Sequence, residues 1–231
     1  IWYSEGSAPC NLSELTVQAD QSGLVGKNSA IDIANRIINS YYNGKMCMYE
    51  FRPAIAANYD GAYDEPKHLI AAQEPWSGFY RLDSGFWMAM HFSRFSPKGW
   101  LFVNGACYGD GEENHAIEHT SHNFMTLVSP DRSEMTMHFT NEDLFPRTYS
   151  VQLKDMGFTN RMLSTVITTG PNPGEAFDAN WFRRGKPIKP SHRNGETYFI
   201  KVPPQSIMTI TTLDTGWVNG VETFSHNIPN A

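Results

Sequence analysis

Several features that identify common classes of protein are missing from this sequence. It has no run of basic residues, and its net charge is −6 at pH 7. This acidic balance excludes a nucleic-acid partner, because phosphate backbones are bound through clustered Lys and Arg. A membrane-spanning helix needs about 20 consecutive apolar residues, and no stretch of that length occurs, so we expect no membrane span. A glycine-rich phosphate-binding loop is also missing.

Cysteine is scarce. The three cysteines, Cys10, Cys47 and Cys107, lack the spacing of a metal site. Two states are compatible with this odd number: one disulfide plus one free thiol, or three free thiols. No signal peptide is visible, since Ile1 begins the sequence without Met or a charged segment, and we expect a processed or partial chain. The glycosylation sequon at Asn11 permits a secretory route.

Aromatic residues, in contrast, are abundant. The chain has 6 Trp, 10 Tyr and 14 Phe, which make up 13% of its 231 residues, within a hydrophobic share of 40%. Such rings contact sugars or apolar ligands in many proteins, but packing in a β-rich core is the more common reason for them. The length allows either one large domain or two small ones.

The first part of the chain has the pattern of an α/β protein. Residues 1–4 are typical of a buried strand, with a loop expected from Gly6 onward. Residues 28–42 have apolar positions at helical spacing, with Ser29 as the N-cap. Residues 69–72 are typical of a second strand, while 85–95 fit either a helix or a strand. This order suits part of an α/β barrel.

After Pro97 the pattern is that of an antiparallel β-sandwich. Short β-branched and aromatic runs are separated by Gly, Pro, Asn and Asp, and residues 135–140 alternate with period two. Residues 170–190, rich in Gly, Pro and Arg, form the longest predicted irregular stretch. We therefore expect two domains, 1–95 and 96–231.

Two glutamates follow the predicted strands of the first domain, Glu5 and Glu74. In an α/β barrel the reactive groups lie at the C-terminal ends of the strands. Hydrolysis of a glycosidic bond needs two carboxylates, about 5–5.5 Å apart in a retaining enzyme. The nearby rings of Trp2, Tyr3 and Trp76 suit the apolar face of a sugar. The alternative at each glutamate is a solvated or turn-bracing side chain.

The histidines offer a further candidate site. His115, His119 and His122 have a spacing that imitates a metal site. On a strand, however, the first two share a face and the third points away, and no other ligand cluster supports them. We expect no metal site.

Four segments together resemble the galactocerebrosidase family of glycoside hydrolases: IWYSEG, IANRIINSYYNG, AAQEPWSGFY and FWMAMHFSRFSPKGW. The resemblance implies the last strands, seven and eight, of a (β/α)8 barrel followed by the β-sandwich. It implies that Glu5 is the catalytic nucleophile. The residues it implies for substrate binding are Trp2, Tyr3, Ser7, Asn35, Glu74 and Trp76. Asn35 stands where the family has an active-site tryptophan.

The resemblance also implies partners. The family's acid/base glutamate has no match here, so a preceding segment of the same precursor, or another chain, would supply it with the earlier barrel strands. The substrate would be a glycoside or glycolipid, without a cofactor, and the location lysosomal or extracellular. The alternatives are a non-catalytic carbohydrate-binding or structural protein on the same scaffold, and one component of a larger assembly.

Overall fold

The computed structural model describes residues 2–7, 23–26, 29–57, 68–72, 75–78, 80–109, 122–176, 178–191 and 195–213. These ranges are rich in strand and contain two α-helices, α1 (Ala30–Tyr42) and α2 (Ser84–Phe95), with two short 3₁₀ turns, η1 (Pro75–Ser77) and η2 (Asn104–Ala106). The strands are β1 (Trp2–Ser7), β2 (Met48–Arg52), β3 (Ile55–Ala57), β4 (Ile70–Ala72), β5 (Arg81–Leu82), β6 (Leu101–Phe102), β7 (Phe124–Val128), β8 (Met135–Asn141), β9 (Arg147–Gln152), β10 (Ser164–Thr169), β11 (Arg183–Arg184), β12 (Thr197–Val202) and β13 (Ser206–Thr211).

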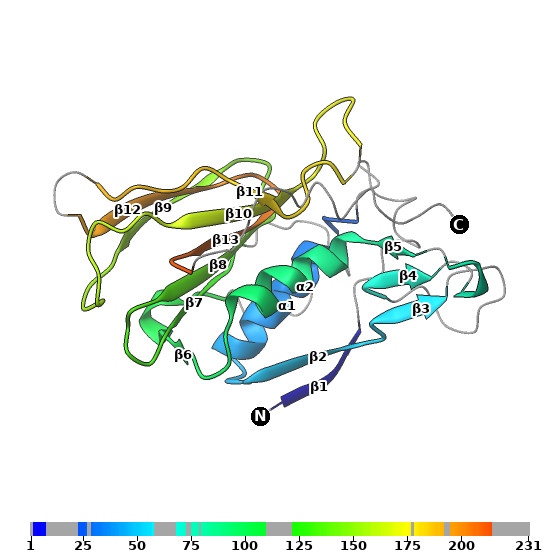
Figure 1. The fold of residues 1–231 in the computed structure, drawn as a ribbon, viewed down its shortest axis with the longest axis horizontal. Coiled ribbons are helices and arrows are strands. Elements are labelled where there is room, and N and C mark those ends of the chain that lie inside the picture. Colours follow the sequence, from blue (N-terminus) through cyan, green and yellow to red (C-terminus); the bar gives the residue numbers. More distant parts are fainter. Residues whose placement is uncertain are drawn as a thin grey trace.

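An antiparallel six-stranded sheet is the centre of the fold (Figure 1), with the strand order β11-β10-β13-β8-β7-β6. The helices α1 and α2 cover one face, and the two-stranded sheet β12-β9 covers the other. The central strands β8 and β13 are therefore buried along their whole length. The antiparallel sheets predicted for the second half of the chain are confirmed.

Side-chain alternation on β8 explains how the two faces differ. Met135, Met137 and Phe139 belong to a hydrophobic cluster with β12, which contributes Tyr198 and Ile200. The intervening polar side chains of β8 bond instead to β13 and to the helices. Because successive residues of a strand point to opposite faces, the period of two places an apolar layer on one side and a polar layer on the other.

The two helices form for reasons visible in their sequences. The Ser29 hydroxyl accepts a hydrogen bond from the Asp32 N–H (3.3 Å), which confirms the predicted N-cap of α1. In α2, Met88, Phe92 and Phe95 recur at helical spacing and are buried, so the segment left undecided by the sequence is a helix.

The layer between α2 and the sheet is a chain of hydrogen bonds that we call the polar seam. Its members are Phe182, Thr168, His91, Thr209, His138 and Ser96, and it begins where the Phe182 N–H donates to the Thr168 hydroxyl (2.9 Å). His91 bonds Thr168 through Nε2 (2.8 Å) and Thr209 through Nδ1 (2.8 Å). His138 bonds the same Thr209 hydroxyl through Nδ1 (2.9 Å) and Ser96 through Nε2 (2.9 Å). A neutral imidazole offers one donor and one acceptor, so two neutral rings let the bonds run head to tail through the seam.

Burial fixes the charge state of both rings. Desolvation lowers the pKa of His138 from 6.5 to about 3. It lowers the pKa of His91 well below 6.5, and the neighbouring His138 adds to that shift. Both histidines are fully buried. They are therefore neutral structural groups that dock α2 on the sheet.

The N-terminal part departs from the sequence prediction at two points. The strand β1 continues through Gly6 and Ser7, where a loop was expected, because these residues pair with Phe51 and Arg52 of β2. The strands β2 and β3 were not predicted at all. As β2 follows α1 and is parallel to β1, the three elements make one β-α-β unit.

The predicted irregular stretch 170–190 is also more ordered than expected. It contains β11, which pairs with β10. Trp181 and Phe182 within it are buried, and Phe182 packs against Trp87 and His91 of α2. Tertiary packing of two large rings overrides the local abundance of Gly and Pro.

Candidate functional site

Glu5 lies at an irregularity of the β1–β2 pairing. Tyr3 is opposite Tyr49 and Gly6 is opposite Phe51, so Ser4 and Glu5 together face the single residue Glu50. This two-against-one arrangement is a β-bulge, a feature that is frequent beside active sites because it re-aims a side chain. The predicted site residues Trp2, Tyr3, Glu5 and Ser7 are thus placed along β1 by its backbone, while their side chains lie outside the described part of the structure.

The AQEPWSG motif occupies a connection between two antiparallel strands. Ile70 of β4 pairs with Leu82 of β5, and η1 lies in the connection between them. Trp76 of η1 has 73% of its surface exposed, so one large ring of the motif is open to solvent. Glu74 lies outside the described residues. The roles predicted for Trp76 and Glu74 in substrate binding stay predictions.

Asn35 has a structural role in this fold. It is 0% exposed on α1, and its side-chain oxygen accepts hydrogen bonds from Asn123 Nδ2 (2.8 Å) and from the hydroxyl of Thr140. Thr140 belongs to β8 and Asn123 immediately precedes β7, so the amide holds α1 against the sheet. Sequence reasoning could not find this role, because both contacts are remote along the chain.

The structure brings only some of the predicted site residues together. β1 pairs with β2, whereas β4 belongs to a separate three-stranded sheet, β3-β4-β5. The strands that carry Glu5 and the AQEPWSG motif, which the sequence presented as two successive strands, are therefore not neighbours in one sheet. β2 leads almost directly into β3, and the two sheets follow each other along the chain (Figure 1).

A large apolar groove of about 1080 Å³ lies between the helices, β2 and the edge of the six-stranded sheet. Six of its lining residues are Tyr41, Met48, Phe51, Met90, Trp100 and Phe102. Beside it, the edge of β2 away from β1 pairs with no strand of the described ranges. Most of the groove lining is apolar, with Cys47 and Lys98 among its few polar side chains. The apolar residues at 46–49 and Trp100 are the sequence signals that could have indicated it.

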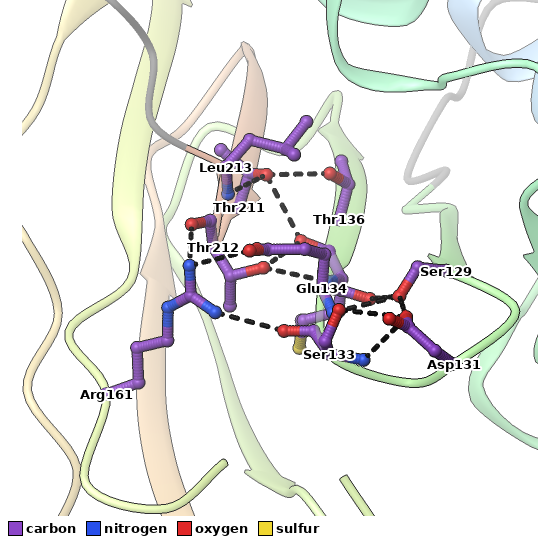
Figure 2. Close-up of polar contacts among 10 residues, drawn as sticks. Ser129, Asp131, Ser133, Glu134, Thr136, Arg161, Thr211, Thr212 and Leu213 are labelled. Atoms are coloured by element: carbon purple, nitrogen blue, oxygen red, sulfur yellow. Dashed lines mark hydrogen bonds and ion pairs between the residues drawn. The ribbon is translucent and has the colours of Figure 1, made fainter. Parts of the chain in front are cut away.

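A dense polar cluster at the turn between β7 and β8 is structural (Figure 2). Asp131 accepts hydrogen bonds from the hydroxyls of Ser129 (2.6 Å) and Ser133 (2.8 Å), which lower its pKa to about 2. Arg161 pairs with Glu134 (2.9 Å) and also donates to the backbone of Thr212. The Asp131 bonds close the turn, and Arg161, from the connection between β9 and β10, joins it to the end of β13, so the cluster braces the fold.

The described residues contain no group of three metal-ligating side chains. His122 stacks on Tyr108 at 5.5 Å, and His115 and His119 lie outside the described part. Cys107 is a buried thiol whose pKa is raised by burial, with Sγ donating to the Val103 carbonyl (3.2 Å). Neither helix of the described ranges is long and apolar enough to cross a membrane.

Comparisons with known proteins point to one group of enzymes. The sequence model of Glycosyl hydrolase family 59 matches residues 1–94. The galactocerebrosidase of Danio rerio is 27% identical over 193 residues, 78% of this chain and 27% of that protein. Those of Salmo salar and Homo sapiens are 29% identical over 199 residues and 31% over 108 residues. The Salmo salar match covers 78% of this chain and 27% of that protein. The Homo sapiens match covers 41% of this chain and 16% of that protein. The chain thus spans about a quarter of the length of the first two relatives.

Solved glycosidase structures share the fold. A family 30 endoxylanase from Clostridium papyrosolvens has a TM-score of 0.57 and 12% identity, over 91% of this chain and 41% of that one. A family 30 xylanase from Clostridium acetobutylicum has a TM-score of 0.59 and 13% identity, over 91% and 42%. At these identities the likeness concerns the fold alone. The sequence matches confirm the resemblance to galactocerebrosidases that the motifs of this chain predicted.

Proposed function

We propose that this chain is the C-terminal portion of a retaining glycoside hydrolase that cleaves β-galactosidic bonds, with Glu5 as the nucleophile. The observation that carries the proposal is the coincidence of two features at one place. Glu5 lies within residues 1–94, which match Glycosyl hydrolase family 59, and it sits in the bulge of β1. A bulge beside a parallel strand pair is a means of turning a carboxylate toward a substrate.

In this proposal Glu5 attacks the anomeric carbon of the sugar. The glycosidic C–O bond breaks as a glutamate elsewhere in the longer protein protonates the leaving oxygen, and the sugar becomes an ester of Glu5. The second glutamate then removes a proton from water, which attacks the same carbon and frees Glu5. The proposed substrate contacts are stacking on Trp2, Tyr3 and Trp76 and polar contacts from Ser7 and Glu74. No cofactor takes part. Asn35 was also predicted to bind substrate, and its burial favours an indirect role through the position of α1.

The proposed architecture has two domains, the end of a (β/α)8 barrel over 1–95 and a β-sandwich over 96–231. The β-α-β unit β1-α1-β2 supports the barrel, because parallel strands joined by a helix are its repeating unit. The edge of β2 that pairs with no strand among the described residues, and the apolar groove beside it, support a longer protein whose further barrel elements cover both. The galactocerebrosidase likeness supports a glycolipid substrate and a lysosomal or extracellular location.

The test uses the longer protein that contains this chain and an aryl β-galactoside. We expect turnover that Glu5→Gln abolishes, while Glu50→Gln, a change to the exposed carboxylate opposite the bulge, retains it. A 2-fluorogalactoside should trap the ester, and peptide mass spectrometry should find the added sugar on Glu5. Product NMR should show the β-anomer first. Full activity of Glu5→Gln, or sugar binding without any turnover, would contradict the proposal.

A further inference from the structure

Arg52 stands at the end of the strand that pairs with β1, the strand of the proposed nucleophile. β1 and β2 are parallel (Figure 1), and in their register Phe51 is opposite Gly6 and Arg52 is opposite Ser7. Arg52 is the last residue of β2, before the chain enters β3 in a different sheet. The family resemblance assigned no role to Arg52, so its place beside β1 comes from the structure alone.

The register brings the backbone of Arg52 close to that of Glu5. Neighbouring strands are about 4.8 Å apart and rise about 3.3 Å per residue. Arg52 lies one strand across and two residues along from Glu5, so the two backbone positions are about 8 Å apart. In a (β/α)8 barrel the C-terminal ends of the strands carry the reactive groups. Arg52 occupies such an end on the strand next to Glu5.

The direction of the Arg52 side chain follows from its neighbours on β2. Tyr49 and Phe51 pack against the hydrophobic cluster that contains the buried side of α1. Because successive side chains of a strand point to opposite faces, Arg52 projects from the face that is turned away from the helices. It is exposed in the described part of the structure. In the proposed barrel the helices surround the strands, so this face is the interior, and Arg52 lies at its C-terminal rim.

A guanidinium at this position suits the hydroxyl groups of a sugar. It presents five N–H donors, accepts no hydrogen bond and keeps its charge. The ring hydroxyls of a galactoside offer acceptors, and hydrogen bonds from a charged donor are stronger than those between neutral groups. We infer that Arg52 is a substrate-binding residue that donates a hydrogen bond to a hydroxyl of the sugar attacked by Glu5. The inference rests on the proposed function for its substrate and adds a second strand to the site.

Kinetics of Arg52 variants in the longer protein test this contact, with the aryl β-galactoside as substrate. Arg52→Ala removes the donors and should lower kcat/KM roughly 30-fold, as expected for one hydrogen bond to a charged group. Arg52→Lys keeps the charge but not the planar fork, and should recover part of this loss. The matched control is Arg184→Ala, which changes an exposed arginine of β11 in the six-stranded sheet and should leave kcat/KM unchanged.

Substrates that each lack one ring hydroxyl distinguish a direct contact from a general effect of charge. For the aryl galactoside without the contacted hydroxyl, the loss caused by Arg52→Ala should shrink to about threefold or less, and it should persist for the others. An equal loss with every member of the series means that Arg52 acts through the charge of Glu5, and contradicts the proposed contact. Full activity of Arg52→Ala contradicts it as well.

Sugar binding provides a readout that needs no turnover. Titration calorimetry with an aryl thio-β-galactoside, which resists hydrolysis, should give a Kd roughly tenfold higher for Arg52→Ala and an unchanged Kd for Arg184→Ala. If the unchanged longer protein binds this compound but does not cleave the aryl galactoside, the proposed function is wrong, and the titration still decides on Arg52. Equal affinities of Arg52→Ala and the unchanged protein, or no binding by either, overturn the inference.

Discussion

Acidification is expected to loosen α2 from the six-stranded sheet, because the polar seam needs neutral histidines. The pKa of His138 is about 3 in the folded protein, against 6.5 for an ordinary histidine. The unfolded or undocked segment therefore binds more protons below pH 6.5, and the contribution of this ring to stability is complete above that pH. It is lost progressively as the pH falls from about 6.5 to about 3.

The magnitude follows from the size of the shift. One pKa unit corresponds to about 1.4 kcal/mol, and pH 5 lies about 1.5 units below 6.5. His138 alone therefore lowers the free energy of undocking or unfolding by about 2 kcal/mol at pH 5. His91, whose pKa is lowered in the same direction, adds to this loss. About 2 kcal/mol corresponds to a roughly 30-fold rise in the local opening equilibrium.

Hydrogen exchange measured by mass spectrometry on the peptide 84–95 of α2 tests this reasoning in the longer protein. After correction for the pH dependence of chemical exchange, protection should fall at least about 30-fold between pH 7 and pH 5. His138→Gln keeps a polar side chain but removes the titrating ring. Protection of the peptide at pH 7 should therefore be lower than in the unchanged protein, and its fall between pH 7 and pH 5 should be smaller by about 30-fold. The control His122→Gln changes a histidine stacked on Tyr108, outside the seam. Identical pH dependence in His138→Gln and the unchanged protein would refute the reasoning.

Two further predictions concern buried groups of the described fold. Asn35→Ala removes the common acceptor of Asn123 and Thr140 and should lower the free energy of unfolding in urea by roughly 2 kcal/mol. Asn35→Trp should lower it further, because the site is 0% exposed and has no room for the larger ring. A stable Asn35→Trp protein would contradict this packing. Met137→Ala, in the core shared with β12, should lower the free energy of unfolding by roughly 2–5 kcal/mol. Phe199→Ala changes a 62% exposed ring on β12 and should leave the free energy of unfolding within about 0.5 kcal/mol of the unchanged protein. Equal losses in these two variants would place the sandwich core elsewhere.

Local patterns were sufficient wherever the determining contacts are close along the chain. The helical spacing and the Ser29 cap predicted α1 almost to the residue. Alternation over 135–140 predicted β8. The segment 85–95 was undecided because a short apolar run fits either a helix or a strand. Its buried contacts with β10 and β13, about 77 and 118 residues away along the chain, make it a helix lying on a sheet.

In the candidate site, too, the local motifs were visible in the sequence and the long-range contacts were not. The motifs around Glu5 and Trp76 are local strings, and the sequence alone identified them and the enzyme family that they resemble. It could not show that Glu5 lies in a bulge, because that depends on how β1 is aligned with β2, more than 40 residues later.

The sequence by itself determined the helix and strand periodicities, the main motifs and the family likeness, because each is written in neighbouring residues. Only the tertiary structure decided which strand pairs with β1 and that His68 contacts Asp83. It also decided that Asn35 and the polar-seam histidines, His91 and His138, are buried. Burial and long-range pairing depend on every layer that packs on a residue, and no short stretch of sequence contains that information.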